Sequence, residues 1–185
     1  MRALVISGGG SKGAFAGGVA QYLMQEKRHE YDLLLGTSTG SLLIPHLALG
    51  NVDKIHRIYT NVNMKRIFNI NPFVVKKRKG IEIVTINHFN VLLQFIKGKR
   101  TFGESQKLRK YIRTSFTLSE FNQLKASKAN IVVTVTNLSK NDVEYKCIRD
   151  FNYEDFCDWI WISCNYIPFM SLVNKDGFDY GDGGF

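Results

Sequence analysis

A serine in the segment GTSTG stands where a nucleophile would be expected. Ser38 is flanked at a distance of two residues by Gly36 and Gly40, and the segment lies between an apolar strand, Tyr31–Leu35, and an apolar helix, Ser41–Leu49. In a strand-to-helix setting, the GxSxG pattern holds the serine hydroxyl on a sharp turn at a helix N-terminus, which favours developing negative charge. The pattern therefore predicts that Ser38 is a catalytic nucleophile.

A serine nucleophile needs a base, and the histidines of this chain do not follow the order of an α/β-hydrolase. In that order the histidine comes after the serine and the acid, whereas the four histidines here are His29, His46, His56 and His88. A carboxylate is therefore expected as the base. Asp182 is the best candidate, because it follows a short predicted strand and lies among glycines that permit a close approach to another loop. A carboxylate has an ordinary pKa of about 3.9, so it needs a direct hydrogen bond to the serine and a water-poor site.

The glycine-rich segment after the first predicted strand supplies the third element. Gly8, Gly9 and Gly10 follow the apolar run Ala3–Ser7. Because their amides open a helix, they can converge on the oxyanion of an acyl intermediate. Lys12 adds charge there or fixes the loop.

The same segment satisfies the GxGxxG pattern of dinucleotide-binding domains through Gly8, Gly10 and Gly13. That pattern requires an acidic residue at the end of the second strand, about 20 residues on, and Asp32 stands instead at the start of its strand. A phosphate-binding P-loop is excluded because Lys12 precedes the last glycine. A nucleotide- or nucleic-acid-binding α/β domain is the alternative to a hydrolase.

The elements that must position these residues alternate along the chain. This alternation indicates a three-layer α/β/α fold with a mainly parallel central sheet, whose functional edge lies at the carboxyl ends of the strands. Residues 1–185 are expected to form a single domain. Apolar runs predict strands over 3–7, 31–35, 81–86, 131–136 and 143–148, and apolar stripes predict helices over 12–25, 41–49, 52–62, 89–96, 105–116 and 153–164. The tail, residues 172–185, is predicted to be short strand and turn.

The chain of 185 residues is 44% hydrophobic, which excludes a disordered or collagen-like protein. Its net charge of +9 is regional: residues 65–113 hold 13 basic and 2 acidic residues, a net +11, and the remainder holds 12 basic and 14 acidic residues, a net −2. The basic segment, 64–115, is expected to be variable and lid-like. It is either a solvated surface or a patch for peripheral contact with an anionic membrane. It contains no recognisable nucleic-acid module, so no nucleic-acid partner is expected.

Within the basic segment, Phe89, Leu92, Leu93 and Ile96 recur at helical spacing. The stripe predicts a helix packed in the core, and the alternative is an interfacial lid that lies on lipid.

Cys147, Cys157 and Cys164 form neither a disulfide framework nor a zinc site, and the last two are expected to be small buried residues. No run of residues reaches the ~18 apolar positions of a membrane span. The apolar run near the N-terminus is too short to be the hydrophobic region of a signal peptide. The protein is therefore expected in the cytoplasm, and at membranes only peripherally.

Together, three motifs resemble those of the patatin-like phospholipases. They are GGGSKG from Gly8 to Gly13, GTSTG from Gly36 to Gly40, and Asp182-Gly183-Gly184, and the segment ISCNYIPF, residues 162–169, resembles the stretch that precedes the aspartate motif. The resemblance implies a three-layer fold and lipid acyl hydrolysis without a metal or other cofactor. It implies a catalytic dyad of Ser38 and Asp182 and an oxyanion hole at Gly8, Gly9 and Gly10, with Lys12, Gly13, Gly36, Gly40, Gly183 and Gly184 as supporting residues.

The implied substrates are fatty acyl esters, above all phospholipids or lysophospholipids, and transfer of the acyl group to another alcohol would use the same chemistry. Members of the family usually continue well beyond the aspartate motif. The chain is therefore expected to be incomplete at its C-terminus.

Overall fold

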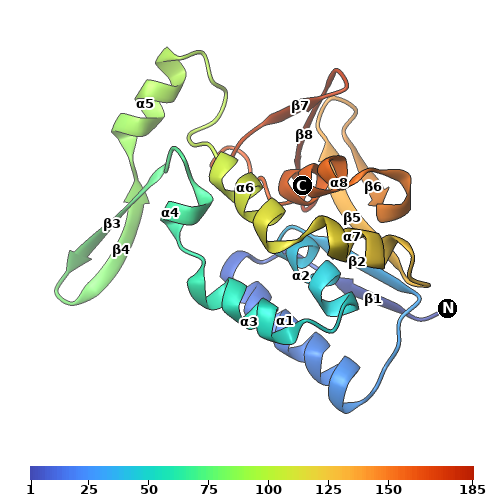
Figure 1. The fold of residues 1–185 in the computed structure, drawn as a ribbon. Coiled ribbons are helices and arrows are strands. Elements are labelled where there is room, and N and C mark those ends of the chain that lie inside the picture. Colours follow the sequence, from blue (N-terminus) through green and yellow to red (C-terminus); the bar gives the residue numbers. More distant parts are fainter.

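The computed structural model describes all 185 residues and is built around a mixed six-stranded sheet (Figure 1). The strand order is β1-β2-β5-β8-β7, and β6 pairs with the other edge of β5. β1, β2 and β5 run parallel, whereas β6 and β8 are antiparallel to β5, and β7 is antiparallel to β8. The strands are β1 (Ala3–Ile6), β2 (Leu33–Thr37), β5 (Asn130–Asn137), β6 (Asp142–Cys147), β7 (Val173–Lys175) and β8 (Phe178–Asp182).

The α/β class with flanking helices is confirmed, and the sheet is partly rather than mainly parallel. The physical reason lies in two short connections. β5 and β6 are joined by residues 138–141, and β7 and β8 by Asp176 and Gly177, both with positive φ angles. Tight turns of this length can only join antiparallel neighbours, since a parallel pair needs a long crossover.

Helices α2 and α8 cover one face of the sheet. The strand side chains on that face, Leu34, Ile131, Val133 and Val135, are at most 1% exposed and form the centre of the core. On the opposite face, Val5 is 64% exposed and Leu35 is half-buried. The helical elements are η1 (Gly10–Lys12), α1 (Gly13–Gln21), the π-helical turn η2 (Tyr22–Glu26), α2 (Thr39–Ala48), α3 (Val52–Asn61), α4 (Met64–Ile67), α5 (His88–Ile96), α6 (Gln106–Ser115), α7 (Leu118–Lys125), η3 (Ile148–Asp150) and α8 (Tyr153–Ser163).

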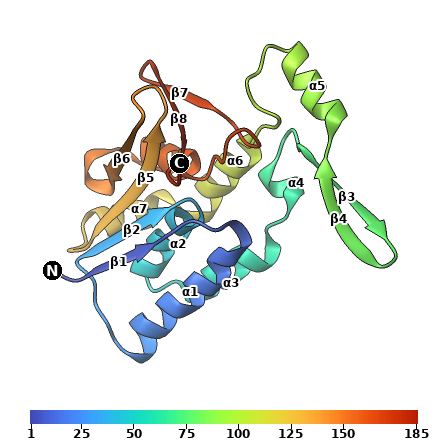
Figure 2. The same ribbon diagram turned by 180° about the vertical axis from the view of Figure 1, so that it is seen from behind.

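Residues 73–100 form an arm that projects from the body of the molecule (Figures 1 and 2). The arm consists of a two-stranded hairpin, β3 (Phe73–Arg78) and β4 (Ile81–Ile86), followed by α5. The expectation that the stripe of α5 packs in the core is wrong, because Phe89, Leu92 and Ile96 are 70%, 58% and 73% exposed. α5 lies in the projecting arm, and no other element covers these side chains.

The cysteines are unpaired, and Cys157 and Cys164 are buried as predicted, while Cys147 is half-buried. No helix of the structure combines the length and the apolar character needed to cross a bilayer.

Candidate active site

The sheet brings Ser38 and Asp182 together because β2 and β8 pair with successive positions on the same edge of β5. β2 occupies one edge of β5 as far as Thr37, which lies opposite Thr134, and β8 occupies the next positions of that edge, with Asp182 opposite Val135. Because β2 is parallel and β8 antiparallel to β5, their carboxyl ends point toward each other. The residue that follows β2 and the last residue of β8 therefore face the same space.

Ser38 stands on a strained turn between β2 and α2. Its φ of 53° and ψ of −122° lie in a region that residues other than glycine rarely adopt. The flanking glycines make this turn possible. A Cβ atom on Gly40 would lie 2.1 Å from the carbonyl oxygen of Ile6, and a Cβ atom on Gly36 would lie 2.6 Å from the backbone of Gly40. The GxSxG spacing thus follows from backbone contacts.

Three side chains hold the backbone of Ser38 in place. The Ser38 amide donates a hydrogen bond to Ser163 Oγ at 2.9 Å, and the Ser38 carbonyl accepts one from Ser41 Oγ at 2.6 Å and one from Cys164 Sγ at 3.2 Å. Burial raises the pKa of the Cys164 thiol to about 12, so the thiol keeps the proton that it donates. Sequence reasoning did not assign roles to these residues, although the small-residue stretch 162–169 was a usable signal.

Asp182 is 4% exposed and has no cationic partner. Its amide donates to the carbonyl of Asn165 at 2.9 Å, and its Oδ1 accepts from the amide of Gly184 at 2.9 Å. Burial raises the pKa of the Asp182 carboxyl, while hydrogen bonding from the Ser38 side chain and from the Gly184 amide acts in the opposite direction. Gly183 packs so closely on Thr134 that a Cβ atom would lie 2.3 Å from its carbonyl oxygen.

The glycine loop lies directly beside the serine. A Cβ atom on Gly8 would be 2.7 Å from Ser38 Cβ, and Gly8, Gly9 and Gly10 line the cavity that also contains Ser38 and Asp182. Lys12 is exposed and lies outside the lining of that cavity, but its amide closes the loop by donating to the carbonyl of Gly9 at 3.1 Å.

Gly13, at the end of the glycine loop, packs closely against Tyr59 and Thr39. A Cβ atom there would lie 2.6 Å from the hydroxyl oxygen of Tyr59 and 3.0 Å from Thr39. Burial raises the pKa of the Tyr59 hydroxyl, so this group stays neutral. The predicted dyad and glycine loop thus lie around one cavity. Lys12 contributes through its backbone amide, which closes the loop.

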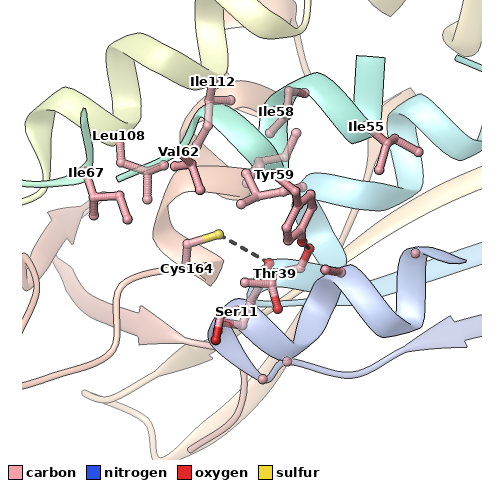
Figure 3. Close-up of a pocket in the computed structure, with 18 of the residues that line it drawn as sticks. Ser11, Thr39, Ile55, Ile58, Tyr59, Val62, Ile67, Leu108, Ile112 and Cys164 are labelled. Atoms are coloured by element: carbon pink, nitrogen blue, oxygen red, sulfur yellow. Dashed lines mark hydrogen bonds between the residues drawn. The ribbon is translucent and has the colours of Figure 1, made fainter. Parts of the chain in front are cut away.

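The shared cavity has a volume of about 1360 Å³ and a largely apolar wall. Figure 3 shows side chains of α3 and α6 on one side of it and Ser11, Thr39 and Cys164 on the other. The apolar wall includes Ile55, Ile58 and Val62 of α3, Ile67 of α4, and Leu108 and Ile112 of α6. A cavity of this size and lining suits a long apolar ligand with one polar group near Ser38.

His46 also lines the cavity but stands apart from Ser38. It lies eight residues further along α2, a rise of about 12 Å. Burial, together with the charge of Lys54, lowers its pKa to about 4, and its Nδ1 has no hydrogen-bond partner. The histidine is therefore neutral and is not placed to act as a base.

Residues 4–185 match the sequence profile of the patatin-like phospholipases. The chain belongs to this family. A cUMP-AMP-activated phospholipase of Escherichia coli is 39% identical over 64 residues, which are 32% of this chain and 20% of that protein. The crystal structure of VipD from Legionella pneumophila has the same fold, with a TM-score of 0.61 and 15% identity over 99% of this chain and 46% of VipD.

The chain thus spans less than half of VipD, and the sequence match covers a fifth of the E. coli relative. The expected family is confirmed. Members of the patatin-like phospholipase family are acyl hydrolases, so membership favours the hydrolase over the nucleotide-binding alternative.

Proposed function

We propose that this chain hydrolyses fatty acyl esters, with phospholipids or lysophospholipids as substrates, by means of a dyad of Ser38 and Asp182. The observation that carries the proposal is the convergence of three elements on one apolar cavity: the strained serine, the buried carboxylate and the loop of Gly8–Gly10. Each element supplies a function that ester hydrolysis requires, namely a nucleophile, a base and oxyanion stabilisation.

In the first half of the reaction, Asp182 accepts the proton of the Ser38 hydroxyl while Ser38 Oγ attacks the ester carbonyl carbon. The carbonyl π electrons move to oxygen, and the amides of Gly8–Gly10 stabilise the resulting oxyanion. When the tetrahedral intermediate collapses, the bond to the alcohol breaks, and Asp182 gives its proton to the leaving alkoxide. Ser38 is left as an acyl ester.

In the second half, Asp182 takes a proton from a water molecule that attacks the acyl-serine. Collapse of the second tetrahedral intermediate releases the fatty acid and returns the proton to Ser38 Oγ. An alcohol in place of water would give acyl transfer by the same steps. The elevated pKa of Asp182 supports its role, because a carboxylate that holds protons more tightly is a stronger base at neutral pH.

The cavity supports a substrate with a long acyl chain. The chain would extend from Ser38 between α3 and α6, where Ile58, Val62 and Ile112 offer apolar contact. The polar head of the lipid would remain at the opening, and part of the basic segment 65–113 would meet an anionic membrane surface.

Labelling with a fluorophosphonate tests the nucleophile, because this reagent forms a stable bond only with an activated serine. The wild-type protein and the Ser119→Ala control, which alters an exposed serine on α7, should label and release fatty acid from phospholipid. Ser38→Ala should do neither while keeping the wild-type circular dichroism spectrum. Labelling that persists in Ser38→Ala, or that is absent from folded wild-type protein, would refute the proposal.

A further inference from the structure

The arm carries a concentration of exposed apolar side chains that the rest of the molecule lacks. Its 28 positions, residues 73–100, hold nine of the twenty large hydrophobic side chains that are exposed in the whole chain. Exposed apolar surface of this extent marks a contact with lipid or with another protein. The nine side chains are Val75, Ile81, Ile83, Val84, Phe89, Leu92, Leu93, Phe95 and Ile96.

The hairpin of the arm has no layer packed on either face. Val75 lies opposite Val84 on one face, and Ile81 and Ile83 are on the other, and all four are at least 41% exposed. A two-stranded hairpin without a covering layer is marginally stable in water. The arm therefore requires a surface that takes up apolar side chains from both faces and from α5.

The charge of the arm indicates which surface this is. The arm holds seven basic residues and one acidic residue, Glu82, a net charge of +6. Lys77 pairs with Glu82 at 3.6 Å, and Lys99 and Arg100 pair with residues of the body, Glu104 and Asp179. The remaining four have no ion pair: Lys76, Arg78, Lys79 and Lys97.

Three of these unpaired cations lie at one end of the arm. The turn between β3 and β4 has positive φ angles at Lys79 and Gly80, which hold Arg78 and Lys79 at the tip of the hairpin. Apolar side chains interspersed with unpaired Lys and Arg are typical of elements that lie in the interface of an anionic membrane. A soluble protein partner would not by itself require this excess of positive charge.

The arm is only one part of the basic segment. In the other part, Arg109 and Arg113 of α6 both pair with Asp158, at 2.6 and 2.9 Å. Lys65, Lys107 and Lys110 are exposed on α4 and α6 without apolar neighbours of the kind found in the arm. The structure therefore separates two groups of cations that the sequence presents as one.

Aromatic contacts connect the base of the arm to the opening of the cavity. Phe73 stacks on Phe169 with ring centroids 5.2 Å apart, and Phe169 stacks on Tyr166 at 6.2 Å. Tyr166 lines the cavity that holds Ser38. A surface bound by the arm would therefore lie near the entrance to the candidate active site.

We propose that the arm is a membrane-contact element, which inserts apolar side chains of the β3–β4 hairpin and α5 into an anionic lipid surface and so presents the cavity to that surface. The presentation of the cavity rests on the proposed lipid hydrolase activity, whereas the binding of the membrane does not. A second copy of the chain is the other possible occupant of the arm, and the experiment distinguishes the two.

Cosedimentation with vesicles measures the binding without hydrolysis when all proteins carry Ser38→Ala. Vesicles of phosphatidylcholine alone are compared with vesicles that also contain phosphatidylglycerol. One variant removes three unpaired charges of the arm, Lys76→Gln, Arg78→Gln and Lys79→Gln. Its matched control removes three exposed charges outside the arm, Lys65→Gln, Lys107→Gln and Lys110→Gln. A third variant, Leu92→Ser with Ile96→Ser, removes apolar surface from α5.

Binding should be tighter to the anionic vesicles and should weaken with salt. Each basic residue at an anionic surface contributes on the order of a fivefold factor, so the charge variant of the arm should bind at least about tenfold more weakly than its control. The Leu92/Ile96 variant should also bind more weakly. With Ser38 restored, the arm variants should hydrolyse a soluble short-chain ester at the wild-type rate and anionic vesicles more slowly.

Equal binding to neutral and anionic vesicles, or equal losses in the arm variant and its control, would overturn the proposal. Dissociation of an oligomer by the arm variants, observed by analytical ultracentrifugation without any vesicle binding, would assign the arm to a second copy of the chain. A protein that binds anionic vesicles through the arm but fails to label at Ser38 would leave the membrane contact intact and refute the hydrolase activity alone.

Discussion

The hydroxyl groups of Thr37 and Thr134 lie 2.5 Å apart, at the position where β2 ends and β8 takes over the same edge of β5. This hydrogen bond joins the last residue before the nucleophile to β5, the strand with which β8 pairs at the position of the base. Gly183, which follows Asp182, packs on the backbone of Thr134. Thr134 of β5 thus contacts a chain neighbour of each residue of the proposed dyad, Thr37 beside Ser38 and Gly183 beside Asp182.

Replacing Thr134 by valine should therefore weaken both the fold and the site. The change removes the partner of the half-buried Thr37 hydroxyl, which should lower the free energy of unfolding by about 1–2 kcal/mol and reduce kcat. Thr136→Val is the matched control on the same strand, because the buried Thr136 hydroxyl has no partner. The control should be neutral or slightly stabilising. Urea unfolding and ester hydrolysis measure both effects, and equal losses in the two variants would contradict the role of Thr134.

Asp182→Asn should greatly reduce turnover and stabilise the protein at neutral pH. Because burial raises the pKa of Asp182, its contribution to stability is greatest below the ordinary pKa and is lost as the pH rises through the raised value. Asparagine resembles the protonated form at every pH. Its variant should therefore unfold at a higher temperature than wild type near neutral pH, and the difference should shrink in acid.

In the same variant, kcat should fall by about two to four orders of magnitude, the usual contribution of a general base. The wild-type kcat should rise with pH as Asp182 loses its proton. A kcat that is unchanged in Asp182→Asn, or a melting temperature that falls more at neutral than at acidic pH, would show that this carboxyl is not the buried base.

The local structure around Ser38 could be predicted from the sequence, because the motif that forms it is local. The strand, turn and helix around Ser38 follow from neighbouring residues. Gly36 and Gly40 are needed there because a side chain at either position would clash with nearby backbone. The antiparallel direction of β8 and the hydrogen bond from the Ser38 amide to Ser163 depend on residues far apart in the chain. Neither could be derived from local periodicity.

The arm shows a different limit of sequence reasoning. β3 was not predicted, because Val74 and Val75 are followed directly by a run of cations that hides the alternation of a strand. The helix α5 was predicted correctly, but its apolar stripe was predicted to be buried and is exposed. Periodicity identifies an apolar face without showing what covers it.

His46 should make the protein sensitive to acid. Its pKa is lowered to about 4 by burial, so its contribution to stability is present above the ordinary value of about 6.5 and is lost as the pH falls toward 4. The shift corresponds to about 3 kcal/mol. His46→Leu should keep more of its stability between these pH values than wild type, as measured by urea unfolding. His56→Leu, at an exposed position of α3, should follow the wild-type curve.

Two glycine-to-alanine changes should have opposite effects on stability. A Cβ atom on Gly40 would lie 2.1 Å from the carbonyl oxygen of Ile6, so Gly40→Ala should destabilise the protein by about 3 kcal/mol or more, or prevent folding. Gly18 lies inside α1 with open space around it, so Gly18→Ala should stabilise the protein by about 1 kcal/mol. Thermal unfolding measures both, and a mild effect of Gly40→Ala would mean that the turn at Ser38 is not tightly packed against Ile6.

The apolar wall of the cavity should set the preferred length of the acyl chain. Ile58 of α3 is half-buried and faces the cavity, so Ile58→Trp should fill part of the space between α3 and α6. Burial of one methylene group is worth about 0.8 kcal/mol, so excluding two of them should lower kcat/KM for a p-nitrophenyl dodecanoate about tenfold. Hydrolysis of the butyrate should change little. Arg57→Trp adds the same side chain at the neighbouring exposed position, outside the cavity lining, and should leave the ratio of the two substrates unchanged. An equal fall in kcat/KM for both esters with Ile58→Trp would indicate damage to the dyad. Unchanged kcat/KM values for both esters would place the acyl chain elsewhere.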